Sequence, residues 1–236
     1  MASISTTTSA AVQATTPRAW LVPGAMIAGI GGPLVLAVCN TLVNFTPDWR
    51  RAESTADGVN ATIAHPVLAE FIIGTGIVAV LLIVPGIWAV AARLAPRTPV
   101  LAAIGGWMMA TGYICALVLS TSSLTEQKIA LSGLDPESFG KAFDAQWPMG
   151  QIMIGAIFGF GALCGGIVLG IAILRQRGGM PKWAGWLLLA AEPVRMAGLG
   201  LGIPVGPPLA SLLILAAFAG VLFAWPGVAT AAAEPA

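Results

Sequence analysis

Charged residues are scarce in this chain of 236 amino acids, and their scarcity excludes most soluble folds. Asp, Glu, Lys and Arg together make up 9% of the sequence, whereas hydrophobic residues make up 57%. A soluble domain carries about 25% charged residues, because its surface has to be wetted. The net charge is only +1 and no basic domain stands out, so we expect no nucleic-acid partner.

Side chains that hold metals and cofactors are equally few. The chain has one histidine, His65, and three cysteines, Cys39, Cys115 and Cys164, which lie far apart inside apolar runs. This spacing matches no metal or redox motif. A Walker loop, a GxSxG elbow and an HExxH motif are also missing. We therefore predict no cofactor, no metal site and no identifiable catalytic residue.

What the sequence does contain is a series of long apolar runs. A helix needs about 20 mostly apolar residues to cross the hydrocarbon core. Six runs approach or exceed this length: Trp20–Phe45, Val67–Leu94, Val100–Ser120, Met149–Leu174, Trp183–Gly202 and Pro207–Trp225. A backbone inside lipid has to satisfy its own hydrogen bonds, so the runs predict helices. The expected fold is an all-α, polytopic bundle of six transmembrane helices over residues 18–227, with disordered polar tails at 1–17 and 228–236.

The distribution of basic residues predicts the orientation of this bundle. Six lie on the side of the short connections: Arg18, Arg93, Arg97, Arg175, Arg177 and Lys182. Four lie on the other side, where seven acidic residues dilute them: Arg50, Arg51, Lys128 and Lys141. Because positive charge stays on the cytoplasmic side, we expect a multi-pass protein of the cell membrane with both termini in the cytoplasm.

The two connections on the outer side are long, and the second has a helical pattern. They are residues Thr46–Pro66 and Thr121–Pro148. In the second, Asp135-Pro136-Glu137 is typical of a helix start. Three aromatic residues then recur at every fourth position: Phe139, Phe143 and Trp147. This pattern predicts a short amphipathic helix that lies on the outer membrane surface or caps the bundle, with or without a role in ligand binding.

Glycine pairs indicate which helix is central. The run Met149–Leu174 contains three GxxxG pairs: Gly155 with Gly159, Gly161 with Gly165, and Gly166 with Gly170. Small residues let helix backbones approach closely in a membrane. These pairs therefore predict close packing within the chain or, alternatively, in a homo-oligomer.

Three ionisable residues fall inside the apolar runs, where each costs about 2.5–3.5 kcal/mol on insertion scales. They are Glu70, Glu192 and Arg195. Glu192 lies about 14 Å along its helix, near the expected midplane, and Arg195 follows one turn later, so the two can pair. Pro193 lies between them and is expected to kink the helix. Several glycines follow it, so we expect the outer half of this helix to be irregular.

Further polar residues are predicted to face the same outer half of the membrane: Asn40, Asn44, His65 and Gln151. Together with the three ionisable residues they form the candidate intramembrane site, in which Arg195 can also reach Glu70 from a neighbouring helix. Two interpretations stay open. Either the charged groups neutralise one another and hold helices together, or they line a polar cavity that opens outward.

The layout resembles that of a group of small bacterial membrane proteins. The turn GMPKWAG at residues 179–185 leads into a leucine-rich helix, and a long outer connection follows the first helix. In these features, and in fitting six helices into fewer than 240 residues, the chain is similar to domain of unknown function 4386, of the actinobacterial type. The resemblance implies a six-helix topology and assigns no site residue.

Three functions are compatible with these patterns. The first is transport or small-ligand handling through an outward-facing polar cavity, and the second is a structural or accessory membrane subunit without a ligand. The third is a membrane-embedded enzyme that uses Glu70 or Glu192 as an acid or base and Arg195 as an anion clamp. The expected partners are the lipid bilayer, a small ligand or lipid, and a second copy of the chain.

Overall fold

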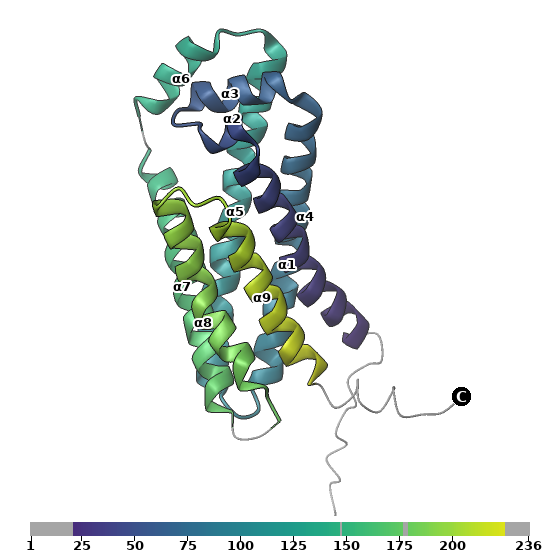
Figure 1. The fold of residues 1–236 in the computed structure, drawn as a ribbon. Coiled ribbons are helices and arrows are strands. Elements are labelled where there is room, and N and C mark those ends of the chain that lie inside the picture. Colours follow the sequence, from purple (N-terminus) through teal and green to yellow (C-terminus); the bar gives the residue numbers. More distant parts are fainter. Residues whose placement is uncertain (1–20, 147, 177–178, 225–236) are drawn as a thin grey trace, which may run out of the picture.

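The computed structural model describes residues 21–146, 148–176 and 179–224, and all regular secondary structure in these ranges is helical (Figure 1). The helices are α1 (Leu21–Phe45), α2 (Pro47–Arg50), α3 (Thr55–Ala64), α4 (Pro66–Leu94), α5 (Pro99–Ser132), α6 (Pro136–Asp144), α7 (Met149–Arg175), α8 (Lys182–Gly200) and α9 (Gly206–Phe223). The all-α fold class is therefore as predicted. The predicted tails, residues 1–17 and 228–236, lie outside the described residues.

Five of these helices are long and apolar enough to cross a membrane: α1, α4, α5, α7 and α9. They lie side by side along the length of the molecule (Figure 1). The sixth predicted span, Trp183–Gly202, corresponds to α8, which has 19 residues. It is not among the five, because Glu192 and Arg195 lower its mean hydropathy.

The outer faces of the long helices are apolar. Leu81 of α4, Trp107 of α5 and Phe160 of α7 are each more than half exposed. Less than half of the most apolar stretch of each of these three helices is buried inside the molecule. Apolar surface of this extent is covered by a partner or a membrane in a stable protein. The bundle is therefore suited to a hydrocarbon surrounding.

Glycines bring the helix backbones into direct contact, most closely between α5 and α7. A Cβ atom at Gly165 would lie 2.3 Å from the backbone nitrogen of Met109, and one at Gly161 would lie 2.8 Å from the carbonyl oxygen of Met108. A Cβ atom at Gly155 or Gly159 would have no neighbour within 4 Å. Of the predicted glycine positions, Gly161 and Gly165 thus pack on α5 and Gly170 packs on α8, whereas the first predicted pair faces open space.

Close glycine contacts also join α1 to α4 and α8 to α9. A Cβ atom at Gly32 of α1 would lie 2.5 Å from the backbone nitrogen of Ile83 in α4. A Cβ atom at Gly198 of α8 would lie 2.5 Å from the Cα atom of Gly206 in α9. Because lipid removes the hydrophobic drive for helix association, such close backbone packing is what holds a membrane bundle together.

The outer connections contain more helix than the sequence predicted. The span predicted to end at Ser120 continues as α5 to Ser132. The first outer connection, expected as a loop, forms α2 and α3. Hydropathy did not indicate these helices, because their sequences are polar and a polar helix has no long apolar run. We call α2, α3, α6 and residues 121–132 the outer cap; its helices gather at one end of the bundle (Figure 1).

Hydrogen bonds at helix starts organise the outer cap. Ser54 and Asp57 form a capping box at the start of α3, and the Ser54 hydroxyl, with the Glu53 backbone, holds the pKa of Asp57 below its usual value. The helix predicted after Asp135 is α6, where the Asp135 side chain accepts a hydrogen bond from the Ser138 backbone.

Helix α6 packs on α3. The hydroxyl and the backbone N–H of Thr55 both donate to the Asp144 carboxylate, and Gly140 lies against Ala56. The rings of Phe139 and Phe143 stack with their centroids 5.5 Å apart, while Trp147, the third aromatic of the predicted stripe, lies outside the described residues.

The glycine contacts yield a stability prediction. Gly165→Ala should lower the free energy of unfolding by about 1–3 kcal/mol or more, because the new methyl group collides with the α5 backbone. Gly155→Ala is the matched control on the same helix, and it should be neutral. Thermal unfolding in detergent micelles, followed by tryptophan fluorescence, measures both. Equal effects of the two substitutions would contradict the packing of α5 on α7.

Candidate functional site

Helix α8 carries a buried ion pair at its middle. Glu192 and Arg195 are one helical turn apart, and Arg195 Nε donates to Glu192 Oε2 over 2.9 Å. Glu192 is 1% exposed and Arg195 6% exposed, so neither acyl chains nor bulk water reach the pair in this conformation. The pairing predicted from the spacing of the two residues is present.

A tyrosine from α5 completes this cluster. The Tyr113 hydroxyl donates to Glu192 Oε1 over 3.0 Å and accepts a hydrogen bond from Arg195 Nη2 over 3.3 Å. Its ring packs edge-on against Phe158 of α7, with centroids 6.4 Å apart. We call Tyr113, Glu192 and Arg195 the buried triad. It ties α8 to α5, two helices that are not consecutive along the chain.

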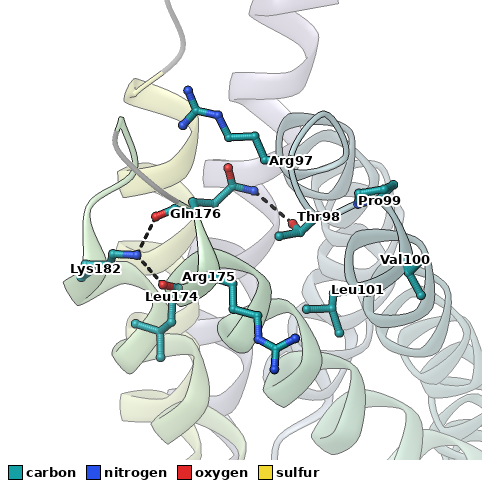
Figure 2. Close-up of a pocket in the computed structure, with 9 residues that line it drawn as sticks. All are labelled: Arg97, Thr98, Pro99, Val100, Leu101, Leu174, Arg175, Gln176 and Lys182. Carbon is teal, nitrogen blue, oxygen red and sulfur yellow. Dashed lines mark hydrogen bonds between the residues drawn. The ribbon is translucent and has the colours of Figure 1, made fainter.

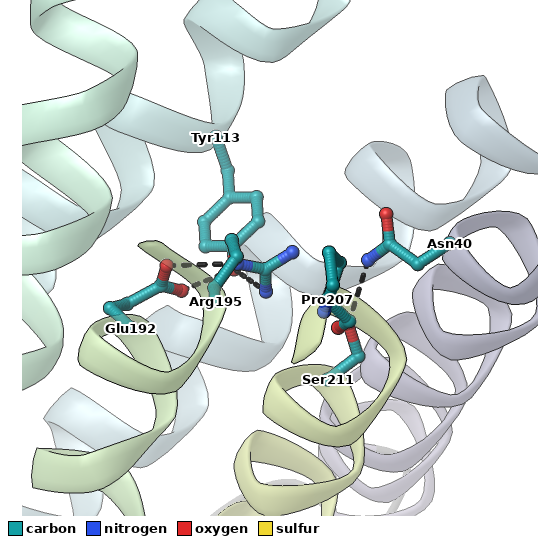
Figure 3. A network of polar contacts seen from close by, with 6 residues as sticks. All are labelled: Asn40, Tyr113, Glu192, Arg195, Pro207 and Ser211. Atoms are coloured by element: carbon teal, nitrogen blue, oxygen red, sulfur yellow. Dashed lines mark hydrogen bonds and ion pairs between the residues drawn. The ribbon is translucent and has the colours of Figure 1, made fainter. Parts of the chain in front are cut away.

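A second polar pair lies in the same region (Figure 3). Asn40 of α1 donates from Nδ2 to the hydroxyl of Ser211 over 2.9 Å. Ser211 of α9, fully buried, donates in turn to the Pro207 carbonyl over 3.1 Å. Polar side chains from α1, α5, α8 and α9 therefore converge in an otherwise apolar bundle.

The electrostatics of the triad are those of a buried charge pair. Removing two charges from water costs several kcal/mol per ion, and their attraction offsets this cost only when the geometry and the hydrogen bonds are good. Here each carboxylate oxygen of Glu192 accepts one hydrogen bond. Within the described part of the chain, Arg195 donates two hydrogen bonds and has five N–H groups, so it retains unused donors.

The other predicted site residues lie elsewhere. Glu70 is on an exposed face of α4 and forms no ion pair with the described residues. The predicted contact between Arg195 and Glu70 is therefore wrong: Glu192, one turn away on the same helix, is the counter-charge of Arg195. Gln151 is half-buried at the start of α7.

His65 and Asn44 make contacts of their own. His65 Nε2 lies 2.8 Å from an Asp48 carboxylate oxygen, and its ring lies 5.9 Å from that of Trp49, so it belongs to the outer cap. Asn44 donates from its side chain to the Asn40 carbonyl over 2.8 Å. Of the seven predicted residues, the structure brings Asn40, Glu192 and Arg195 to one region, and Asn44 adjoins it on the outer side.

Sequence reasoning missed Tyr113 and Ser211. Tyr113 is the only tyrosine in the chain and occurs inside an apolar run, where a phenol needs a hydrogen-bond partner when buried. A single tyrosine inside an apolar run could therefore have been recognised as a candidate from the sequence. Ser211 gave no such signal, because a serine in a membrane helix usually bonds a carbonyl of its own helix, as Ser211 also does here.

The outer half of α8 is regular, contrary to the prediction. The helix continues through Pro193 to Gly200, and the irregular segment is the connection from Leu201 to Val205. Gly202 there adopts φ +64, a left-handed conformation that glycine permits. Of the glycines after Pro193, Gly198 packs directly against Gly206 of α9, whereas a Cβ atom at Gly200 or Gly202 would have no neighbour within 4 Å.

Within the described residues, no group of three His, Cys, Asp or Glu side chains is placed to hold a metal ion. Comparisons with models of protein families, with curated proteins and with solved structures find no match. The resemblance to domain of unknown function 4386 therefore stays a prediction.

The triad gives a second stability prediction. Arg195→Met should lower the free energy of unfolding by about 3–5 kcal/mol, because it leaves the Glu192 carboxylate buried without its counter-charge. Adding Glu192→Leu should recover much of this loss, since two apolar side chains need no compensation. Unfolding by SDS titration in mixed micelles measures the single and double variants. A double variant whose loss equals the sum of the two single losses would contradict the ion pair.

Proposed function

We propose that this chain is a non-enzymatic, multi-pass membrane protein that handles a small ligand at the buried triad. In this proposal α8 is the sixth spanning helix, and the structure corresponds to a closed state of the site. The resemblance to domain of unknown function 4386 supports the six-helix topology. The ligand carries an acceptor or anionic group that reaches the unused N–H groups of Arg195.

The two ends of the bundle support the orientation. Arg93, Arg97, Arg175 and Lys182 lie at the end opposite the outer cap, around two neighbouring pockets that share Arg97. Basic residues next to membrane helices stay in the cytoplasm. We therefore place this end inside and the outer cap outside, with α6 near the outer membrane surface.

The convergence of polar groups from four helices is the observation that carries the proposal. An ionisable residue inside a membrane costs free energy, and a bundle of this kind could be held together by apolar packing alone. In this chain α1 contributes Asn40, α5 Tyr113 and α9 Ser211 to the region around the α8 pair (Figure 3). Among the described residues buried in the bundle, only Glu192 and Arg195 carry charges that have to be neutralised, and they neutralise each other. The additional polar groups therefore indicate a ligand-binding site.

Hydrogen-bonding side chains extend from the region of the triad toward the outer end of α1. Asn44 is half-buried in the last turn of α1, and its side chain bonds the carbonyl of Asn40 one turn deeper. Asn40 contacts Ser211. These three residues supply successive hydrogen-bonding groups between the outer cap and the triad, as an outward-opening path requires.

A structural role is the second candidate, and one observation favours it. The carboxylate of Glu192 is fully paired and the triad is closed, so it already functions as a lock between α5 and α8. The enzyme hypothesis gains no such support: among the described residues Glu192 is the one carboxylate in contact with Arg195, and Glu70 lies away from it.

Water access from outside separates the two candidates. We propose Ser211→Cys in a background whose three native cysteines are replaced by alanine, treated with a membrane-impermeant, positively charged thiosulfonate. Ser211 is fully buried, and a thiol reacts only as the thiolate, which needs water. If the site opens outward, Ser211→Cys is labelled from outside in intact cells.

Two further positions calibrate this measurement. Ile214→Cys, one turn deeper on the same helix and fully buried, should stay unlabelled, while Lys128→Cys in the exposed outer cap should react at once. Labelling at position 211 no faster than at position 214 would exclude an outward-opening site and leave the structural role.

A further inference from the structure

The largest described pocket lies at the basic end of the bundle, away from the triad. It has a volume of about 810 Å³ and is formed by the first turn of α5, the last turn of α7 and the start of α8 (Figure 2). Sites for small molecules and cofactors range over roughly 300–1,000 Å³. This pocket is large enough for a phospholipid headgroup and the adjoining part of its acyl chains.

Among the residues that the structure describes, three cationic side chains and no carboxylate line this pocket. The cations are Arg97, Arg175 and Lys182. Arg175 is exposed and forms no hydrogen bond or ion pair with the described residues. In Figure 2 its guanidinium lies beside Leu101, with Gln176 between it and Arg97. A guanidinium held against apolar side chains is stabilised by an anion more strongly than it would be in water.

The helix carbonyls that would repel an anion here are covered. Lys182 Nζ donates to the carbonyl oxygens of Leu174 and Gln176 at the end of α7. The Gln176 side chain donates to the Leu94 carbonyl at the end of α4 over 3.0 Å. Lys182 thus places a positive charge at the negative end of the α7 dipole, and Gln176 occupies a carbonyl at the end of α4.

The start of α5 adds free donors. Its first-turn N–H groups at Val100 and Leu101 have no acceptor within the helix. The N-cap residue Thr98 makes no side-chain cap, because its hydroxyl donates to the Leu94 carbonyl and accepts from Gln176. An uncapped helix start that lines a pocket beside two arginines is suited to an anionic oxygen, and phosphate oxygens bind such helix starts well.

Apolar side chains form the remaining wall. Val100, Leu101 and Leu174 also line the pocket, and Val100 is more than half exposed. The apolar outer surfaces of α5 and α7 continue from this wall toward the middle of the bundle. A phospholipid would match both parts of the pocket: its phosphate would lie beside the arginines, and its acyl chains would lie along the apolar surfaces of α5 and α7.

We propose that this pocket, which we call the inner groove, binds the headgroup phosphate of an anionic membrane phospholipid, with Arg175 and the start of α5 as its contacts and with Arg97 adding positive charge from the other side of Gln176. Basic pockets between helix ends on the cytoplasmic side of membrane proteins recognise anionic headgroups in this way. The groove lies at the opposite end of the bundle from the outer cap, so it does not depend on the small-ligand site.

Native mass spectrometry of the full-length, detergent-solubilised protein tests the proposal. The titrated probe is dioleoyl phosphatidylglycerol, with dioleoyl phosphatidylcholine as the neutral lipid and sodium phosphate as the soluble anion. The phosphatidylglycerol should bind more tightly than the phosphatidylcholine. The pair Arg97→Gln and Arg175→Gln should weaken its binding about 30-fold, as expected for the loss of two positive charges near the headgroup.

Two variants keep the test specific. The control pair Lys128→Gln and Lys141→Gln removes the same charge from the outer cap and should change the affinity by less than about twofold. Val100→Trp fills the apolar part of the groove at an exposed position, keeps every charge, and should also weaken lipid binding. Retained affinity in Val100→Trp would overturn the groove as the site.

The remaining outcomes also overturn the proposal. If the control pair weakens binding as much as the arginine pair, the attraction belongs to the net charge of the protein. If sodium phosphate competes with the lipid at equal concentration, the site takes a soluble anion instead of a phospholipid.

Discussion

The arrangement of this bundle depends on one constraint: an ionised side chain buried among apolar helices has to be paired and shielded from its surroundings. Helix α8 carries the two charges that face this constraint most severely, Glu192 and Arg195. It is placed between α7 and α9, and its charged face is turned toward α5, where Tyr113 bridges both partners. Rotating α8 about its axis would separate Glu192 and Arg195 from Tyr113 and turn the charged pair out of the bundle.

Close packing makes that orientation accessible. A charged face is shielded only if the neighbouring backbones come near enough to exclude lipid. Gly170 meets Gly185 between α7 and α8, and Gly198 meets Gly206 between α8 and α9. The glycine contacts and the charged pair therefore act together in positioning α8. The glycines bring α8 into the bundle, and the ion pair determines which face of the helix is buried.

The two ends of the bundle differ in chemistry. At the end with the short connections, Lys182 and Gln176 cover helix carbonyls and leave a positively charged groove. At the other end, the outer cap closes over the bundle through α3 and α6, joined by hydrogen bonds between Thr55 and Asp144. This asymmetry supports the orientation that we propose, with the basic end in the cytoplasm and the outer cap outside.

Hydropathy predicted the positions of the long helices well, because length and apolarity are local properties. The sequence also predicted the Glu192–Arg195 pair, since two residues three apart on a helix share a face. It did not identify the Tyr113 contact, and it placed Glu70 in the site, because hydropathy does not specify which faces of different helices meet. The continuation of α5 to Ser132 was missed because its outer part is polar.

The most direct test of this account is the accessibility of nitroxide labels placed singly along α8 in lipid vesicles. Oxygen, which concentrates in hydrocarbon, and a water-soluble nickel chelate relax the label in different surroundings. The account predicts helical periodicity, with oxygen reaching positions 186, 190 and 197 and neither reagent reaching positions 188, 191 and 195. Relaxation by the nickel chelate along the whole helix, or by oxygen at the second group, would show that α8 does not cross the membrane with its charged face turned inward.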